Sequence, residues 1–165
     1  MSSPPSIETR YLELYEQEMP KVYRFVASRV NSKALAEDIT SESFMRTWDY
    51  LREGGKIENM RAFVYRVANN LIIDHYRSKR RTEVALDETH ESISAGGEHE
   101  MRRNADVALL QMHLNNLPDD YATILTYRFV EDMGVQEIAK LTGKSSANIY
   151  VIIHRAVKLL RKRMN

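Results

Sequence analysis

Apolar residues recur at intervals of three and four along most of this chain. The clearest example is the last segment, where residues spaced four, three and four apart predict one inward helix face: Ile149, Ile153, Ala156 and Leu160. No stretch combines the apolar-polar alternation, β-branched density and turn residues of a β-hairpin. The pattern predicts an all-α fold.

Charge divides the 165 residues into three parts. Lys and Arg exceed Asp and Glu by 14 to 11 in residues 1–81 and by 8 to 5 in residues 108–165, whereas acidic residues exceed basic ones by 7 to 2 in residues 82–107. Basic ends favour contact with phosphates, and an acidic tract with weak periodicity is typical of a solvated connector. We therefore expect two small helical domains, 1–81 and 108–165, joined by a flexible acidic linker, 82–107. Charge alone leaves open that this distribution arose by chance.

Composition excludes several classes of protein. The chain has no cysteine, which rules out disulfides, thiolate metal sites and cysteine nucleophiles, and a reducing cytoplasm is the expected compartment. No run approaches the roughly 20 apolar residues that span a bilayer, and the first ten residues lack the apolar core of a signal peptide, so no membrane insertion is expected. No histidine has a companion at coordinating spacing, and no nucleophile, base and orienting group occur together. We expect no metal, no cofactor and no enzymatic activity.

Turn and cap residues divide the periodic segments into helices. Pro20 is a good first-turn residue, so one helix is expected from about Tyr11 to Pro20 and a second from Pro20 to about Val30. Asn31 or Ser32 would cap a long helix to about Arg52. Further helices are expected at about 59–77, 107–117 and 118–130.

Residues 133–164 have the pattern of a helix-turn-helix. Val135 and Ile138 give a short first helix its apolar face, Gly143 permits the tight turn, and Ser145 or Ser146 can cap the second helix. The outward side of the second helix would meet base edges and phosphates in a major groove through Ser146, Asn148, Tyr150, Val151, His154, Arg155 and Lys158. The alternative is an ordinary helical hairpin with a solvated basic end.

Three stretches together resemble a known family, the extracytoplasmic-function sigma factors of the sigma-70 family. Its region 2 resembles LYEQEMPKVYRFVASRV with ALAEDITSESFMRTWDYL, and its promoter-opening helix resembles NMRAFVYRVANNLIIDHYRSKRR. Its region 4 is similar to LPDDYATILTYRFVEDMGVQEIAKLTGKSSANIYVIIHRAVKLLRK. The resemblance implies binding to core RNA polymerase, at its clamp helices and flap, and to promoter DNA. It also implies a cognate anti-sigma factor as a partner.

Residue roles follow from the same resemblance. The surface that docks on polymerase would consist of Glu37, Asp38, Ser41, Glu42 and Arg46, and Asp38 and Glu42 share a helical face on spacing alone. Recognition and melting of the minus-ten element would use Arg61, Arg66, Asn70, Arg77, Lys79, Arg80 and Arg81. Asn70 aligns with the position that helps to hold a flipped non-template base. A solvated acidic face and an exposed helical asparagine are the alternative interpretations.

The second helix of the helix-turn-helix departs from the family pattern. Asn148, Tyr150, Val151 and Ile152 stand where many relatives have polar phosphate-contacting residues, whereas Arg155 aligns with a base-contacting position. Region 4 is therefore expected to read the minus-thirty-five element, with altered affinity or sequence preference. The competing function is a stand-alone helix-turn-helix regulator, which needs no polymerase-docking surface.

Overall fold

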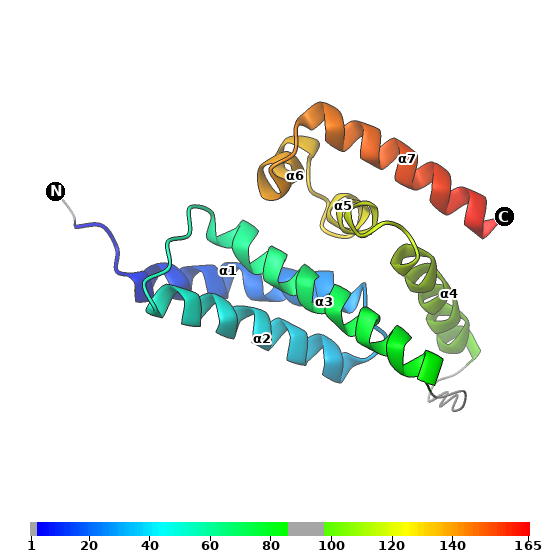
Figure 1. Ribbon diagram of the computed structural model, residues 1–165, viewed down its shortest axis with the longest axis horizontal. Helices are drawn as coiled ribbons and strands as arrows, with labels where there is room; N and C mark the ends of the chain where they lie inside the picture. Colours follow the sequence, from blue (N-terminus) through cyan, green and yellow to red (C-terminus); the bar gives the residue numbers. More distant parts are fainter. Residues whose placement is uncertain (1–2, 86–97) are drawn as a thin grey trace.

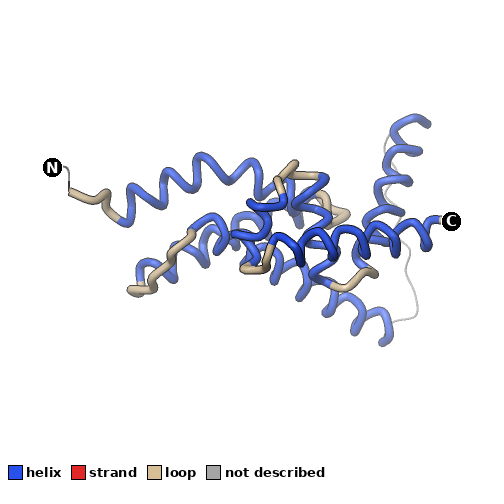
Figure 2. The backbone as a smooth tube through the Cα atoms, turned by 90° about the horizontal axis from the view of Figure 1, so that it is seen from above, coloured by secondary structure: helices blue, strands red, loops and turns tan. Residues whose placement is uncertain are grey.

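The computed structural model describes residues 3–85 and 98–165, and every regular element within these ranges is a helix (Figures 1 and 2). The helices are α1 (Ile7–Ala27), α2 (Lys33–Arg52), α3 (Met60–Ala85), α4 (Glu98–Asn115), α5 (Asp119–Phe129), α6 (Val135–Thr142) and α7 (Ser146–Met164). The expected all-α class is confirmed.

Two serine caps and one glycine turn lie where the sequence predicts. Ser32 caps α2, its hydroxyl accepting from the Leu35 amide at 3.3 Å, and Ser145 caps α7 by accepting from the Asn148 amide at 3.1 Å. Gly143 has φ 72° at the end of α6, a left-handed conformation that favours glycine. The turn of the helix-turn-helix is therefore formed as expected, with Ser145 as the cap rather than Ser146.

The expectation of two helices meeting at Pro20 is wrong, because α1 runs without interruption from Ile7 to Ala27. Proline in a helix interior removes one hydrogen bond and costs about 3 kcal/mol. Leu14 before the proline and Val22 and Phe25 after it are all buried on the same side of α1. Continuing the helix keeps this apolar face intact, which offsets the local cost of Pro20.

Two helix boundaries also differ from the expected ones. α3 was expected to end near Arg77 and continues to Ala85, and α4 was expected to begin near Val107 and begins at Glu98. The added turns are rich in Arg, Lys and Glu, which form helix readily without an apolar face. Helix thus enters both ends of the tract 82–107. Residues 86–97 lie outside the described residues, and the flexibility of the linker stays a prediction.

The N-terminal helices α1, α2 and α3 pack as a three-helix bundle, with α5 and α6 against one side of it (Figure 1). α7 packs on α5 and α6 and lies on the far side of them from the bundle (Figure 1). The inward face of α7 differs slightly from the expected one: Ile152 is buried, whereas Ile153 and Leu160 are only half-buried.

One aromatic cluster joins the two halves of the chain. Phe25 of α1 and Tyr127 of α5 stack with their ring centroids 5.1 Å apart, and Tyr65 of α3 meets each of them edge-on at 5.4 Å. All three rings are buried. The apolar core therefore extends from the N-terminal bundle into the C-terminal half.

Candidate functional site

The outer face of α2 carries the residues expected to dock on polymerase. Glu37, Asp38, Ser41 and Arg46 are exposed and Glu42 is half-buried. The opposite side of α2 is buried through Ala36, Ile39, Ser43, Phe44, Thr47 and Leu51. The helix therefore brings the whole predicted set to one solvent-facing surface. Arg46 Nε donates to Glu42 Oε1 at 2.7 Å, an i,i+4 pair that orders the middle of this surface.

Met45 belongs to the same surface and was missed. Its side chain is 59% exposed, and it lies between Glu42 and Arg46 on the outer side of α2. The sequence did contain a signal, since Met45 is a large apolar residue outside the three- and four-residue spacing of the buried positions of α2. An apolar side chain among charged ones is typical of a protein-binding surface.

The outer face of α3 carries the residues expected to contact the minus-ten region. The exposed members of the set are Arg66, Asn70, Arg77, Lys79, Arg80 and Arg81. Arg66 and Asn70 border a hollow of about 250 Å³, whose other wall comes from the C-terminal half and includes Asp120, Thr123 and Lys144. The predicted base-capturing asparagine thus faces the C-terminal half of its own chain.

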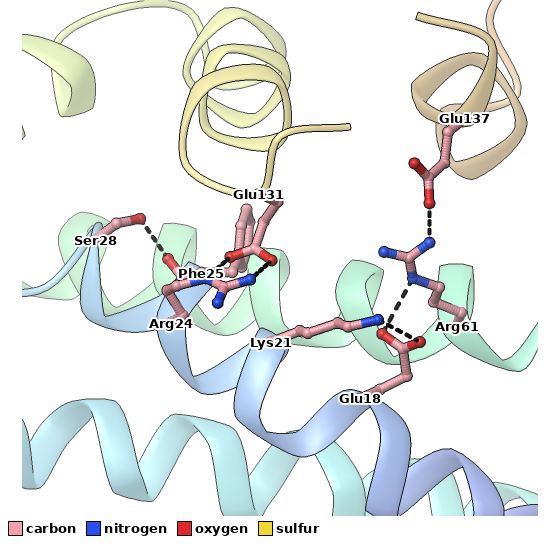
Figure 3. Close-up of polar contacts among 8 residues, drawn as sticks. All are labelled: Glu18, Lys21, Arg24, Phe25, Ser28, Arg61, Glu131 and Glu137. Atoms are coloured by element: carbon pink, nitrogen blue, oxygen red, sulfur yellow. Dashed lines mark hydrogen bonds and ion pairs between the residues drawn. The ribbon is translucent and has the colours of Figure 1, made fainter. Parts of the chain in front are cut away.

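Arg61, at the start of α3, is held by two ion pairs that together join three helices (Figure 3). Its Nε donates to Glu18 of α1 at 3.1 Å, and its Nη1 donates to Glu137 of α6. The Arg61 side chain is 25% exposed. Its predicted contact with DNA requires that Glu137 move away.

Three further contacts connect basic residues of the N-terminal half to the C-terminal half. Arg24 of α1 binds both carboxylate oxygens of Glu131, at 3.1 and 2.9 Å (Figure 3). Arg77 Nη2 lies 3.7 Å from Asp119, and Arg80 donates to the carbonyl of Asn115 at 3.1 Å. Members of the expected DNA-binding set are therefore partnered within the chain.

Amide side chains complete the junction between the halves. Gln111 of α4 donates to the carbonyls of Ala27 and Val30 at the end of α1, at 3.2 and 3.0 Å. Asn69 of α3 accepts from the Thr123 hydroxyl of α5 at 2.8 Å. Sequence reasoning missed Asn69, Glu131 and Glu137, because a contact between distant segments leaves no periodic signal.

The second helix of the helix-turn-helix, α7, presents its predicted reading face to solvent. Asn148, Tyr150, Val151, His154, Arg155 and Lys158 are exposed, whereas Ser146 is half-buried at the first position of the helix. Tyr150 is 64% and Val151 44% exposed. Ile149, Ile152 and Ala156 fix the rotation of α7 by packing inward. The geometry satisfies the requirement that a recognition helix leave one face free for the groove.

Neither a metal site nor a membrane span is found in the described part of the chain. Among the side chains that the structure describes, in residues 3–82 and 105–165, no three of His, Asp or Glu cluster as metal ligands would. None of the helices there combines the length and hydropathy that crossing a bilayer requires.

Family models match both halves of the chain. The model described as sigma-70 region 2 matches residues 14–82, and the model described as sigma-70, region 4, matches residues 108–160. Region 2 thus covers most of α1, all of α2 and most of α3, and region 4 covers the end of α4, all of α5 and α6, and most of α7. Of the three candidate surfaces, those on α2 and α3 fall in region 2 and the one on α7 falls in region 4.

Curated relatives match across both regions. The RNA polymerase sigma factor SigV of Bacillus subtilis is 32% identical, with 84% of this chain and 81% of that protein covered. The ECF RNA polymerase sigma factor SigM of the same organism is 26% identical, with 93% and 94% covered. The ECF RNA polymerase sigma factor BldN of Streptomyces coelicolor is 32% identical over 90% of this chain, which spans only 58% of the length of BldN.

The helix-turn-helix and the two matched regions define a two-region transcription initiation factor. The chain belongs to the sigma-70 family and is a sigma factor of the extracytoplasmic-function type. Proteins of this family are generally non-enzymatic subunits that bind core RNA polymerase and direct it to promoters.

A solved structure shares the fold. The sigma factor RpoE in complex with the anti-sigma factor NepR from Bartonella quintana matches with a TM-score of 0.63, 17% identity, and coverage of 93% of this chain and 95% of that chain.

Proposed function

We propose that this sigma factor docks on core polymerase through the outer face of α2, captures the opened minus-ten strand on α3, and reads the minus-thirty-five element with α7. The observation that carries the proposal is the separation of these three surfaces. Each consists mostly of exposed residues on a helix whose opposite side is fixed by the core. Domains 1–81 and 108–165 joined by residues 82–107 are the organisation that this division of labour requires.

The competing function is a stand-alone helix-turn-helix regulator that acts by occupying DNA. Such a regulator usually dimerises on a palindrome and has no need of a polymerase-docking face. The exposed α2 surface with Met45 at its centre favours the sigma-factor function. Binding of the isolated N-terminal half to core polymerase would separate the two functions, since a stand-alone regulator predicts none.

The cellular compartment, the lack of catalytic activity and a further protein partner follow from the same proposal. The chain acts in the cytoplasm, where polymerase works and where a protein without disulfides is the ordinary case. It has no catalytic activity of its own, because the polymerase carries out the chemistry. An anti-sigma factor is a further expected partner, and the exposed apolar residues of α4 suit a protein partner of this kind: Val107, Leu109, Leu110 and Met112.

Arg155 is expected to specify one base pair and Lys158 to bind phosphate. A bidentate contact from Arg to a base edge contributes about 1–3 kcal/mol of discrimination. Arg155→Ala should therefore reduce the difference in affinity between matched and mismatched upstream elements, whereas Lys158→Ala should weaken all sequences alike. Titrations of polymerase holoenzyme with matched and mismatched probes measure both effects. Equal losses on both probes for Arg155→Ala would reassign it to phosphate binding.

Val151 is expected to contact the methyl group of a thymine. Its exposed apolar side chain lies one helical turn before Arg155, where polar phosphate contacts are missing from this chain. Burying one methyl contributes about 0.8 kcal/mol, close to fourfold in affinity. Replacing single thymines of the upstream element by deoxyuridine should cost this amount at one position. Val151→Ala should abolish the difference at that position, and an unchanged difference would remove Val151 from base reading.

A further inference from the structure

The geometry points to a phosphate-binding site in a hollow between the C-terminal part of α3 and the end of α4. The hollow has a volume of about 240 Å³, and since one water takes up ~30 Å³, it has room for one or two phosphate groups. Its lining comes from the turn between α1 and α2, from α3, from α4 and from the turn that follows α4. None of the lining residues belongs to the docking set on α2 or the reading set on α7.

The charged groups at the hollow are basic. Lys79 and Arg80 are exposed on α3 and supply two cations, and no acidic side chain in the described part of the chain lines the hollow. Arg80 Nη2 donates to the carbonyl of Asn115 at 3.1 Å, which holds the guanidinium beside the hollow and leaves its other N–H groups for a ligand. A hollow lined by one sign of charge raises the local concentration of the opposite ion.

Donors reach the hollow from three parts of the chain. Asn31 comes from the turn between α1 and α2, Lys79 and Arg80 come from α3, and Asn116 comes from the turn after α4. A carboxylate is planar and presents two oxygens, whereas a phosphate is tetrahedral and presents up to four. Donors that converge from several directions therefore suit phosphate better than a carboxylate, and charge-assisted bonds of this kind are the strong ones.

A buried guanidinium lies directly behind the hollow. Arg29 is only 3% exposed, its Nε donates to the side-chain oxygen of Asn115 at 3.1 Å, and its carbonyl accepts from the hydroxyl of Tyr76 at 2.5 Å. Both of these partners line the hollow. Nη1 of Arg29 is buried with no hydrogen-bond partner. Within the described residues no carboxylate forms an ion pair with Arg29, and Asp119, whose charge acts on it from farther away, lies 3.7 Å from Arg77 instead.

This buried charge gives phosphate binding a second source of stabilisation. Burial lowers the pKa of Arg29, because its charged form is kept away from water. Buried charges are ordinarily paired, and one without a counter-charge costs stability. A phosphate in the hollow would lie across Asn115 from Arg29, where the low dielectric of the interior strengthens their attraction. Binding should therefore offset a cost that the chain otherwise bears.

The phosphate group has two possible sources, because Lys79 and Arg80 also belong to the proposed strand-capturing set on α3. One source is a free oligophosphate such as pyrophosphate, which would compete with strand capture. The other is one backbone phosphate of the captured strand, to which the hollow would add a contact. This choice rests on the proposed function of α3, whereas the phosphate site itself does not.

The first test measures thermal unfolding of the full chain in inorganic pyrophosphate, with the ionic strength held constant by sodium chloride. At a pyrophosphate concentration ten times its Kd, the Tm should rise by about 3–6 °C. Ala108→Glu places a carboxylate in the hollow from an exposed position of α4, so it should remove this response. Ala108→Gln is the matched control, since it adds similar bulk without charge and should keep the response.

Asn31→Asp introduces the same charge from the opposite wall with no change in bulk, and it should also remove the response to pyrophosphate. Circular dichroism checks that each variant retains its helix content. A wild-type chain whose Tm does not respond to pyrophosphate would overturn the proposal, and so would a wild-type response in both Ala108→Glu and Asn31→Asp.

A second test distinguishes the two sources. It uses a labelled single strand with a minus-ten sequence, in which one methylphosphonate linkage removes the charge of a single phosphate at each position in turn. If a backbone phosphate occupies the hollow, one position should weaken binding to the wild-type chain about tenfold and have no further effect on Ala108→Glu. Equal effects of every linkage on both chains would assign the hollow to a free oligophosphate. A pyrophosphate response without strand binding by any variant would support the phosphate site and refute strand capture by α3.

Discussion

Reversing two charges on α2, Asp38→Arg with Glu42→Arg, is expected to weaken binding to core polymerase by about a hundredfold. The two substitutions change the outer face of α2 from mixed charge to strongly basic. They also remove the carboxylate of Glu42 that binds Arg46. In the proposed complex, basic groups of polymerase face the acidic residues of α2, so the two new arginines would meet like charges. Such contacts cost several kcal/mol, and about 2.8 kcal/mol corresponds to a hundredfold loss of affinity. Both side chains lie outside the core, so helix content should not change. Fluorescence anisotropy with purified core polymerase measures the affinity.

The matched control for this prediction is Glu13→Arg with Glu16→Arg, which adds the same charge at exposed positions of α1. The control should retain near wild-type affinity if α2 carries the docking surface. Wild-type affinity of the Asp38→Arg, Glu42→Arg variant for core polymerase would contradict the assignment of the docking surface to α2.

Asn70→Ala is expected to lower run-off transcription from duplex promoters by about tenfold while leaving duplex binding unchanged. Asn70 is exposed on α3, and a base edge becomes available to it only after the strands separate. Loss of one base contact worth about 1.4 kcal/mol accounts for a tenfold change. Permanganate reactivity of promoter thymines should fall in parallel, because fewer complexes are open.

A template with a preformed mismatch bubble separates opening from later steps. Such a template removes the cost of unpairing, so Asn70→Ala should recover part of its activity on it. Ser78→Ala provides the control, since Ser78 is exposed on the same helix and outside the predicted set. Wild-type activity of Asn70→Ala on both templates would leave Asn70 as an ordinary exposed residue.

Local patterns predicted most of the fold. The periodicity, the Ser32 and Ser145 caps and the Gly143 turn are encoded within a few residues of one another, and the structure has them as expected. The predicted helix break at Pro20 failed because a buried face on both sides of the proline was worth more than one lost hydrogen bond. Local rules do not weigh the packing of a whole helix.

The candidate surfaces were predictable in part. A residue's exposure on α2, α3 or α7 follows from helical spacing, so these sets were found in the sequence with help from the family resemblance. The contact between the halves was not predictable. Tyr65 and Tyr127 are 62 positions apart, and Arg24 and Glu131 are 107 positions apart. Nothing in a periodic pattern indicates which distant helices will meet, and the roles of Glu131 and Glu137 become visible only in three dimensions.

The most direct test of the central claim is run-off transcription from a genomic fragment library with purified core polymerase, with and without this chain. The sigma-factor function predicts discrete transcripts that appear only when the chain is added, start downstream of a shared pair of sequence elements, and disappear with Asp38→Arg and Glu42→Arg. Transcripts that are unchanged by the chain, or reduced at sites it occupies, would contradict a sigma factor and favour a stand-alone regulator.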